Sequence, residues 1–202
     1  MLLLLSILLI GVLVGLGLGG DLRNLADVSI RLWWLIPVAL VLQVLPVPQG
    51  ETGPTRLLPV AAVLLSYVAL ILVVLVNWRL RGFLLILAGL ILNFIVIGMN
   101  HGMPVAEEAL ERAGNPALRE GPGDRGAKHH LADERDVLLP LADVIAFSEP
   151  FGVVVSAGDV VIDIGGATFL GTAILGRPAR RRREPKRRPQ TVPQAGMWGT
   201  RR

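Results

Sequence analysis

Long runs of apolar residues alternate with short polar segments along this chain. The runs cover residues 2–18, 32–46, 57–76, 83–99 and 157–175. A helix that crosses a bilayer needs about 20 apolar residues, with a range of about 17–25. Four runs meet or approach this length, whereas the second must borrow flanking residues, sit tilted beside thinned lipid or be re-entrant. The pattern predicts an all-α fold, a polytopic helical membrane bundle of about five spans.

The first apolar run is interpreted as a retained span rather than a cleaved signal peptide. It lacks a basic segment before it, it is longer than a typical signal-peptide core, and no A-x-A-like site follows it. The 52% hydrophobic composition and the mean hydropathy of +0.60 also exceed what is usual for a soluble domain. The chain has no cysteines, which excludes disulfides, thiol nucleophiles and cysteine-based metal sites.

Charge is distributed unevenly between the loop before the last run and the segment after it. Residues 101–152 contain ten Asp/Glu and five Lys/Arg, whereas residues 177–202 contain ten Lys/Arg and one acid. Short cytoplasmic segments are enriched in Lys and Arg. With five spans, one arrangement places the basic segments together on the inside of the cell membrane. It puts the N-terminus outside and the C-terminus in the cytoplasm.

Tryptophan positions agree with this orientation. Trp33, Trp34 and Trp78 would all lie at the cytoplasmic interface, where indole rings are enriched. Residues 1–176 are predicted to form the membrane domain, with an ordered outer loop at 101–152. Residues 177–202 are predicted to be a disordered basic tail with affinity for anionic lipid heads rather than for nucleic acid.

The outer loop contains two segments with a structural prediction. Residues 104–114 are interpreted as a short helix, with Pro104 in its first turn and Gly114 after its end. Residues 137–147 are apolar but too short to span. They are expected to pack on the outer ends of the helices or to lie in the interface.

Three glycines in the first run are spaced by four residues: Gly11, Gly15 and Gly19. This spacing places them on one helix face, where another backbone can approach closely. Packing against a later span of the same chain is favoured, and homodimerisation is the alternative.

Several polar residues lie in or beside the last two runs. Ser156-x-x-Asp159 before an apolar stretch is a capping-box pattern with Asp in place of Glu or Gln. Asp163 lies one helical turn further in, and an ionisable group within a span is a functional candidate. Asp163 and Asp159, with Asn93 and Asn100, are therefore the candidate polar or ion pathway. The alternative is a cap at Asp159 and a wet or amide-paired carboxylate at Asp163.

All three histidines lie in the outer loop, at positions 101, 129 and 130. His101, His129 and Asp143 form a candidate outer-loop motif. Imidazole and carboxylate together suit Zn²⁺, but the spacing matches no recognised motif, so no metal site and no cofactor are predicted. No phosphate-binding loop, dinucleotide fingerprint or nucleophile elbow is present.

The chain resembles an uncharacterised family of bacterial multi-pass membrane proteins that is defined only as a domain of unknown function. Four places carry the resemblance: Gly19-Gly20 with Leu25-Ala26-Asp27 and Trp33-Trp34, Asn100-His101-Gly102-Met103-Pro104-Val105, Leu141-Ala142-Asp143-Val144-Ile145, and Ser156-Ala157-Gly158-Asp159-Val160. His101 and Ala146 depart from the family pattern. The resemblance implies no activity.

Three functional hypotheses follow. The first is a non-enzymatic accessory or scaffold subunit in the bilayer, with a protein partner or as a homodimer. The second is a small transporter or an ion or proton pathway through Asp159 and Asp163. The third is an extracytoplasmic enzyme that acts on lipid or cell-wall precursors.

Overall fold

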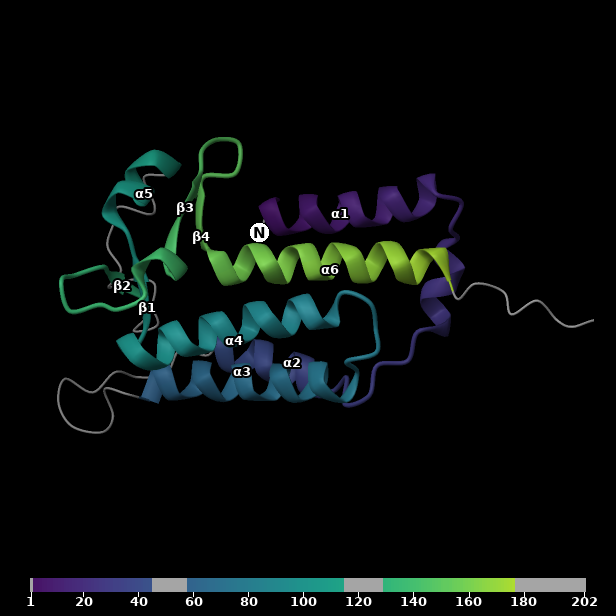
Figure 1. Ribbon diagram of the computed structural model, residues 1–202, viewed down its shortest axis with the longest axis horizontal. Coiled ribbons are helices and arrows are strands. Elements are labelled where there is room, and N and C mark those ends of the chain that lie inside the picture. Colours follow the sequence, from purple (N-terminus) through teal and green to yellow (C-terminus); the bar gives the residue numbers. More distant parts are fainter. Residues whose placement is uncertain (1, 45–57, 115–128, 177–202) are drawn as a thin grey trace, which may run out of the picture.

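The computed structural model describes residues 2–44, 58–114 and 129–176, and it is mostly helical (Figure 1). Its helices are α1 (Leu2–Gly17), α2 (Leu35–Val44), α3 (Leu58–Val76), α4 (Phe83–Asn100), α5 (Glu107–Ala113) and α6 (Ala157–Leu175), with 3-10 helices η1 (Leu22–Asp27) and η4 (Leu139–Leu141). The basic tail lies outside the described residues.

Three helices are long and apolar enough to cross a membrane, by length and composition. These are α3, α4 and α6, with 18 or 19 residues each. A rise of about 1.5 Å per residue makes each roughly as long as the hydrocarbon core is thick, about 30 Å. Helices α1 and α2 are apolar but shorter. The membrane class is therefore supported by three helices, and the finer prediction of five spans remains a prediction.

A four-stranded sheet corrects the prediction of an all-α fold. Its order is β2-β1-β3-β4, formed by β1 (Met103–Val105), β2 (His129–Leu131), β3 (Asp143–Phe147) and β4 (Val153–Ser156). Strand β1 is parallel to β2 and to β3, whereas β3 and β4 are antiparallel. The pairing joins segments that are far apart in the sequence, and strands of three to five residues are too short for a clear alternating pattern.

The sheet changes two predictions for the outer loop. The helix predicted from residue 104 begins only at Glu107, because Pro104 and Val105 belong to β1. The segment 137–147, expected on the helix ends or in the interface, contains η4 and β3. Buried residues of α5, Ala109, Leu110 and Ala113, place that helix against β3 and β4.

The sheet is a direct continuation of two of the three candidate membrane-spanning helices. Strand β1 follows α4 after a reversal at His101 and Gly102, both with positive φ. Strand β4 runs into α6 at Ser156, the N-cap residue. Met103 of β1 packs in a buried cluster with Val60, Val63, Val96, Ile97 and Ala142. The sheet therefore forms a cap on one end of the bundle, and we call β1–β4 with α5 the cap.

Helix α6 packs between α1 and α4 through positions without side chains (Figure 1). A Cβ at Gly11 would overlap the backbone of Ala167, and a Cβ at Gly15 would meet Gly171. On the other side of α6, a Cβ at Gly89 would overlap the carbonyl of Gly158. Residue numbers rise together from the Gly11–Ala167 contact to the Gly15–Gly171 contact, so α1 and α6 run parallel.

Gly19 differs from the other two glycines of its predicted face. It lies beyond the end of α1 with φ of 89°, and no atom lies within 4 Å of the Cβ it would carry. Its role is to reverse the chain rather than to admit another helix, since a positive φ favours glycine.

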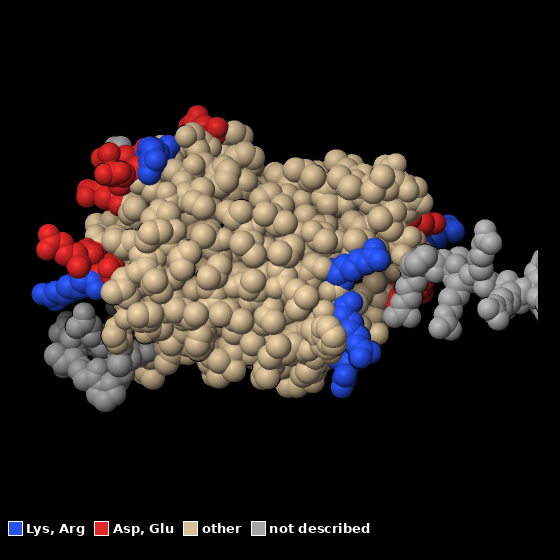
Figure 2. Space-filling view, viewed as in Figure 1, with Lys and Arg blue, Asp and Glu red and all other residues tan. Residues whose placement is uncertain are grey.

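Charged side chains gather at the two ends of the molecule. Figure 2 shows most Asp and Glu of this view on the cap, Arg at the opposite end, and a surface between them that is almost free of charge. The opposite end contains the turn with Arg79 and Arg81, next to the exposed Trp78. Such a belt of uncharged surface between two charged ends is what a bilayer requires.

The first prediction compares two alanine substitutions in α1. Gly11→Ala is expected to lower the free energy of unfolding by about 1–3 kcal/mol, because its methyl group must push α1 away from Ala167. Gly17→Ala is the control, since its methyl group meets no atom within 4 Å. Thermal or denaturant unfolding in a mild detergent measures both. Equal stability of the two variants would show that α1 does not pack on α6 through this face.

Candidate functional site

The polar residues predicted at the start of the last span form a helix cap. The Asp159 backbone N–H donates to Ser156 Oγ at 3.0 Å, and the Ser156 backbone N–H donates to Asp159 Oδ2 at 3.1 Å. The predicted capping box is therefore present, with both of its reciprocal hydrogen bonds. It places the Asp159 carboxylate at the N-terminus of α6, where the helix dipole favours a negative charge.

Asn93 of α4 joins this cap to two other helices. Its Nδ2 donates to Asp159 Oδ1 at 2.7 Å and to the Tyr67 hydroxyl at 3.3 Å, and its Oδ1 accepts from Ser156 Oγ at 2.9 Å. Asn93 and Ser156 are completely buried. The contact depends on Gly158, because a Cβ there would overlap the Asn93 amide. We call Tyr67, Asn93, Ser156 and Asp159 the polar cluster.

A cavity of about 180 Å³ lies beside the polar cluster, where the sheet meets the helices. Helices α2, α3, α4 and α6 and strands β1, β2 and β3 all contribute to its wall. The lining residues are Gln43, Val63, Tyr67, Asn93, Ile97, Met103, His129, Asp143 and Asp159. Gln43 is fixed by a 3.0 Å hydrogen bond from its Nε2 to Ser66 Oγ. The cavity thus has polar groups on one part of its wall and aliphatic or thioether groups on another.

Two residues of the predicted outer-loop motif reach this cavity from the sheet. His129 starts β2 and Asp143 starts β3, on either side of β1, and His129 Nε2 lies 3.8 Å from Asp143 Oδ2. The Asp143 side chain is 11% exposed, so this carboxylate is largely removed from water. The third residue of the motif, His101, is exposed at the C-terminal cap of α4 and does not line the cavity.

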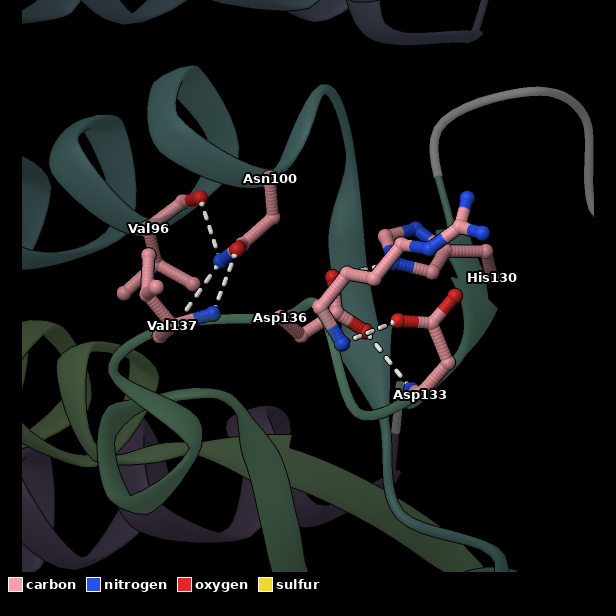
Figure 3. Close-up of polar contacts among 7 residues, drawn as sticks. Val96, Asn100, His130, Asp133, Asp136 and Val137 are labelled. Atoms are coloured by element: carbon pink, nitrogen blue, oxygen red, sulfur yellow. Dashed lines mark hydrogen bonds and ion pairs between the residues drawn. The ribbon is translucent and has the colours of Figure 1, made fainter.

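Two predicted pathway residues lie outside the polar cluster. Asn100 accepts from the Val137 backbone N–H at 2.8 Å and donates to the Val137 carbonyl at 2.9 Å and the Val96 carbonyl at 3.0 Å (Figure 3). It holds the loop of the cap to the end of α4. Asp163 is half-buried one turn beyond Asp159, and the amide of Asn93 bonds to Asp159.

A second group of polar contacts orders the loop after β2. Figure 3 shows His130 pointing at Asp136, with 2.9 Å between His130 Nε2 and Asp136 Oδ1. The other oxygen of Asp136 accepts from the Asp133 backbone N–H at 2.8 Å. Adjacent histidines therefore have different surroundings: His129 lines the cavity, and His130 supports this loop.

Tyr67 was not predicted as a site residue. It is the only tyrosine of the chain and lies in the middle of the apolar run 57–76, which was a usable sign of a polar contact within the bundle. Gln43 also lines the cavity, and its contact with Ser66 joins α2 to α3. Its place in the wall of the cavity depends on tertiary packing alone.

The described residues offer no obvious metal centre. No group of three or more His, Cys, Asp or Glu among residues 2–44, 58–114 and 129–176 is arranged to hold a metal ion. Ser156 is not arranged as a nucleophile, since its hydroxyl donates to Asn93 and accepts from the Asp159 backbone. The cluster binds its own parts together and presents no recognisable set of acid, base and nucleophile.

Comparison with known proteins identifies one family. The model of a family of unknown function (DUF5317) matches residues 27–170. The match includes every residue of the polar cluster and of the cavity wall, whereas α1 precedes it. No curated protein and no solved structure matches the chain.

The second prediction concerns the amide of Asn93. Asn93→Leu is expected to lower the free energy of unfolding by about 2 kcal/mol, because it leaves Asp159 Oδ1 and the Ser156 hydroxyl without this partner. Thr168→Val is the control, since the Thr168 hydroxyl donates only to the Ile164 carbonyl of its own helix. Unfolding in detergent measures both variants.

Asn93→Leu and Ser156→Ala are also expected to be coupled by about 1 kcal/mol in a double-mutant cycle. Additive effects would contradict the proposed contact.

Proposed function

This chain belongs to the family of unknown function (DUF5317), and we infer that it is a non-enzymatic integral membrane protein that acts as an accessory or scaffold subunit. The observation that carries the inference is the polar cluster. Its amide, hydroxyl and carboxylate groups bond to one another and to the helix cap. Polar groups arranged in this way fix helices relative to one another.

Polar side chains at the basic end of the bundle support the same inference. Asn77 bonds to the backbone of Arg31 and of Val73, and Asn24 donates to the Ile174 carbonyl. These side chains join the helix ends and η1 through backbone groups. A transport pathway through Asp159 and Asp163 would need polar groups along its whole length. Asp159 is instead engaged in the polar cluster, and Asp163 lies outside that cluster.

The proposed orientation places the cap outside the cell membrane and the basic end in the cytoplasm. The Arg side chains of the α3–α4 turn and the exposed Trp33, Trp34 and Trp78 support it. In this orientation, α5 and the loops of the cap face the extracytoplasmic medium, and the basic tail reaches anionic lipid heads on the inner side. A folded cap on a membrane anchor suits a protein that presents a surface to a partner subunit.

The third prediction tests this orientation with single cysteines, which the cysteine-free chain makes unambiguous. Glu134→Cys, in the cap, is expected to react with a membrane-impermeant maleimide in intact cells. Arg81→Cys, in the α3–α4 turn, is expected to react only after the membrane is permeabilised. The unmodified chain is the control for background labelling. The reverse labelling pattern would invert the proposed topology.

The fourth prediction tests the accessory role. Purification of the tagged full-length protein from its native membrane in a mild detergent is expected to recover one reproducible protein partner in stoichiometric amount, measured by mass spectrometry. Thr168→Val is expected to retain this partner, whereas Asn93→Leu is expected to lose most of it, because the cap is no longer fixed to the helices. Recovery of the wild-type chain alone would contradict the accessory role.

A further inference from the structure

The cavity at the junction of cap and bundle is lined by two carboxylates, and one of them, Asp159, belongs to the polar cluster. Asp159 accepts one hydrogen bond at each oxygen, from Asn93 and from the Ser156 backbone. An ionised carboxylate offers about four lone-pair sites, so both oxygens can accept again. Asp143 lines the same cavity from the sheet.

The charge of the cavity wall favours a positively charged occupant. Its ionisable groups among the described residues are Asp143, Asp159, Tyr67 and His129, and none of the described lining residues is Lys or Arg. His129 lies 3.8 Å from Asp143 and faces the same space. Two carboxylates in one wall attract a positive charge and disfavour an anion.

The shape and remaining wall of the cavity narrow the class of ligand. A volume of about 180 Å³ limits the occupant to a small molecule or to the headgroup of a larger one. Val63, Ile97 and Met103 give part of the wall an apolar surface that suits a short carbon chain. A divalent metal ion fits less well, because Ca²⁺ takes six to eight oxygen ligands and no suitable group of three ionisable ligands is present among the described residues.

We propose that this cavity binds the primary ammonium group of a small amine, with Asp143 and Asp159 as the carboxylates that receive its N–H donors and Tyr67 beside them. A primary ammonium has three donors and a compact charge, which matches two carboxylates that approach from different elements. A quaternary ammonium has no N–H donor and is larger, so it binds more weakly here. The binding function goes beyond the scaffold role.

Two sources can supply such a group: a free amine, or the headgroup of an aminated lipid. In the proposed orientation the cavity lies near the outer ends of the helices, at the level of Asp159, so a lipid headgroup of the outer leaflet is within reach. The level of the cavity in the bilayer depends on the proposed topology, whereas its binding of an amine does not. If cysteine labelling inverts the topology, amine binding still tests the cavity by itself.

The fifth prediction is tested with the full-length protein in nanodiscs that contain no aminated lipid. Isothermal titration calorimetry measures the binding of ethanolamine and of a short-chain phosphatidylethanolamine, with choline and the matching phosphatidylcholine as comparisons. At least one primary amine is expected to bind about tenfold or more tightly than its quaternary counterpart, since charge-assisted hydrogen bonds are lost in the latter. Binding of ethanolamine identifies a free amine as a sufficient ligand, and binding of the phospholipid alone identifies a lipid headgroup.

Variants connect that binding to the cavity. Asp143→Asn is expected to weaken it at least about tenfold, whereas Glu134→Gln, an exposed cap residue outside the cavity, leaves it unchanged. If Asp143→Asn does not fold, Tyr67→Phe provides the test instead. This variant preserves the shape of the wall and is expected to weaken binding severalfold. Absence of binding by either primary amine, equal binding by the cavity variants, or binding of Na⁺ alone would overturn the proposal.

Discussion

The side-chain amide of Asn93 links three helices and the cap through hydrogen bonds that lipid cannot replace. It donates to Asp159 and Tyr67 and accepts from Ser156. Ser156 is both the last residue of β4 and the N-cap of α6, so a contact with its hydroxyl fixes the sheet and the helix together. Because the alternative in a bilayer is an unsatisfied polar group, this contact limits how α4 and α6 can slide or rotate.

Close approach of the helices makes that contact possible. The Asn93 amide reaches the first turn of α6 only because Gly158 has no Cβ, and Gly89 admits the carbonyl of Gly158 one turn away. On the opposite side of α6, Gly11 and Gly15 of α1 let that helix approach α6 in the same manner. Small residues and a few hydrogen bonds therefore take the place of the hydrophobic effect, which does not drive helix association within lipid.

Asp159 belongs both to the structural polar cluster and to the wall of the proposed binding cavity. The hydrogen bonds within the polar cluster hold α3, α4 and α6 together. The Asp159 side chain also lines the cavity, together with Asp143. The two carboxylates come from α6 and β3, so the cavity exists only when cap and bundle are assembled. Anything bound there would contact both parts and would stabilise their junction by the free energy of its binding.

The sequence by itself determined the apolar runs, the uneven charge, the helix cap at Ser156 and Asp159, and the resemblance to a family of unknown function, because these depend on neighbouring residues. It also indicated Asn93 as a polar group within a span, and Asp143 and His129 as part of an outer-loop motif. Only the tertiary structure decided that a sheet covers the bundle, that Asn93 meets Asp159, and that Tyr67 lines a cavity with Asp143. The physical reason is that short strands and side-chain contacts join residues distant in the chain. Their partners depend on how helices pack, which no local pattern specifies.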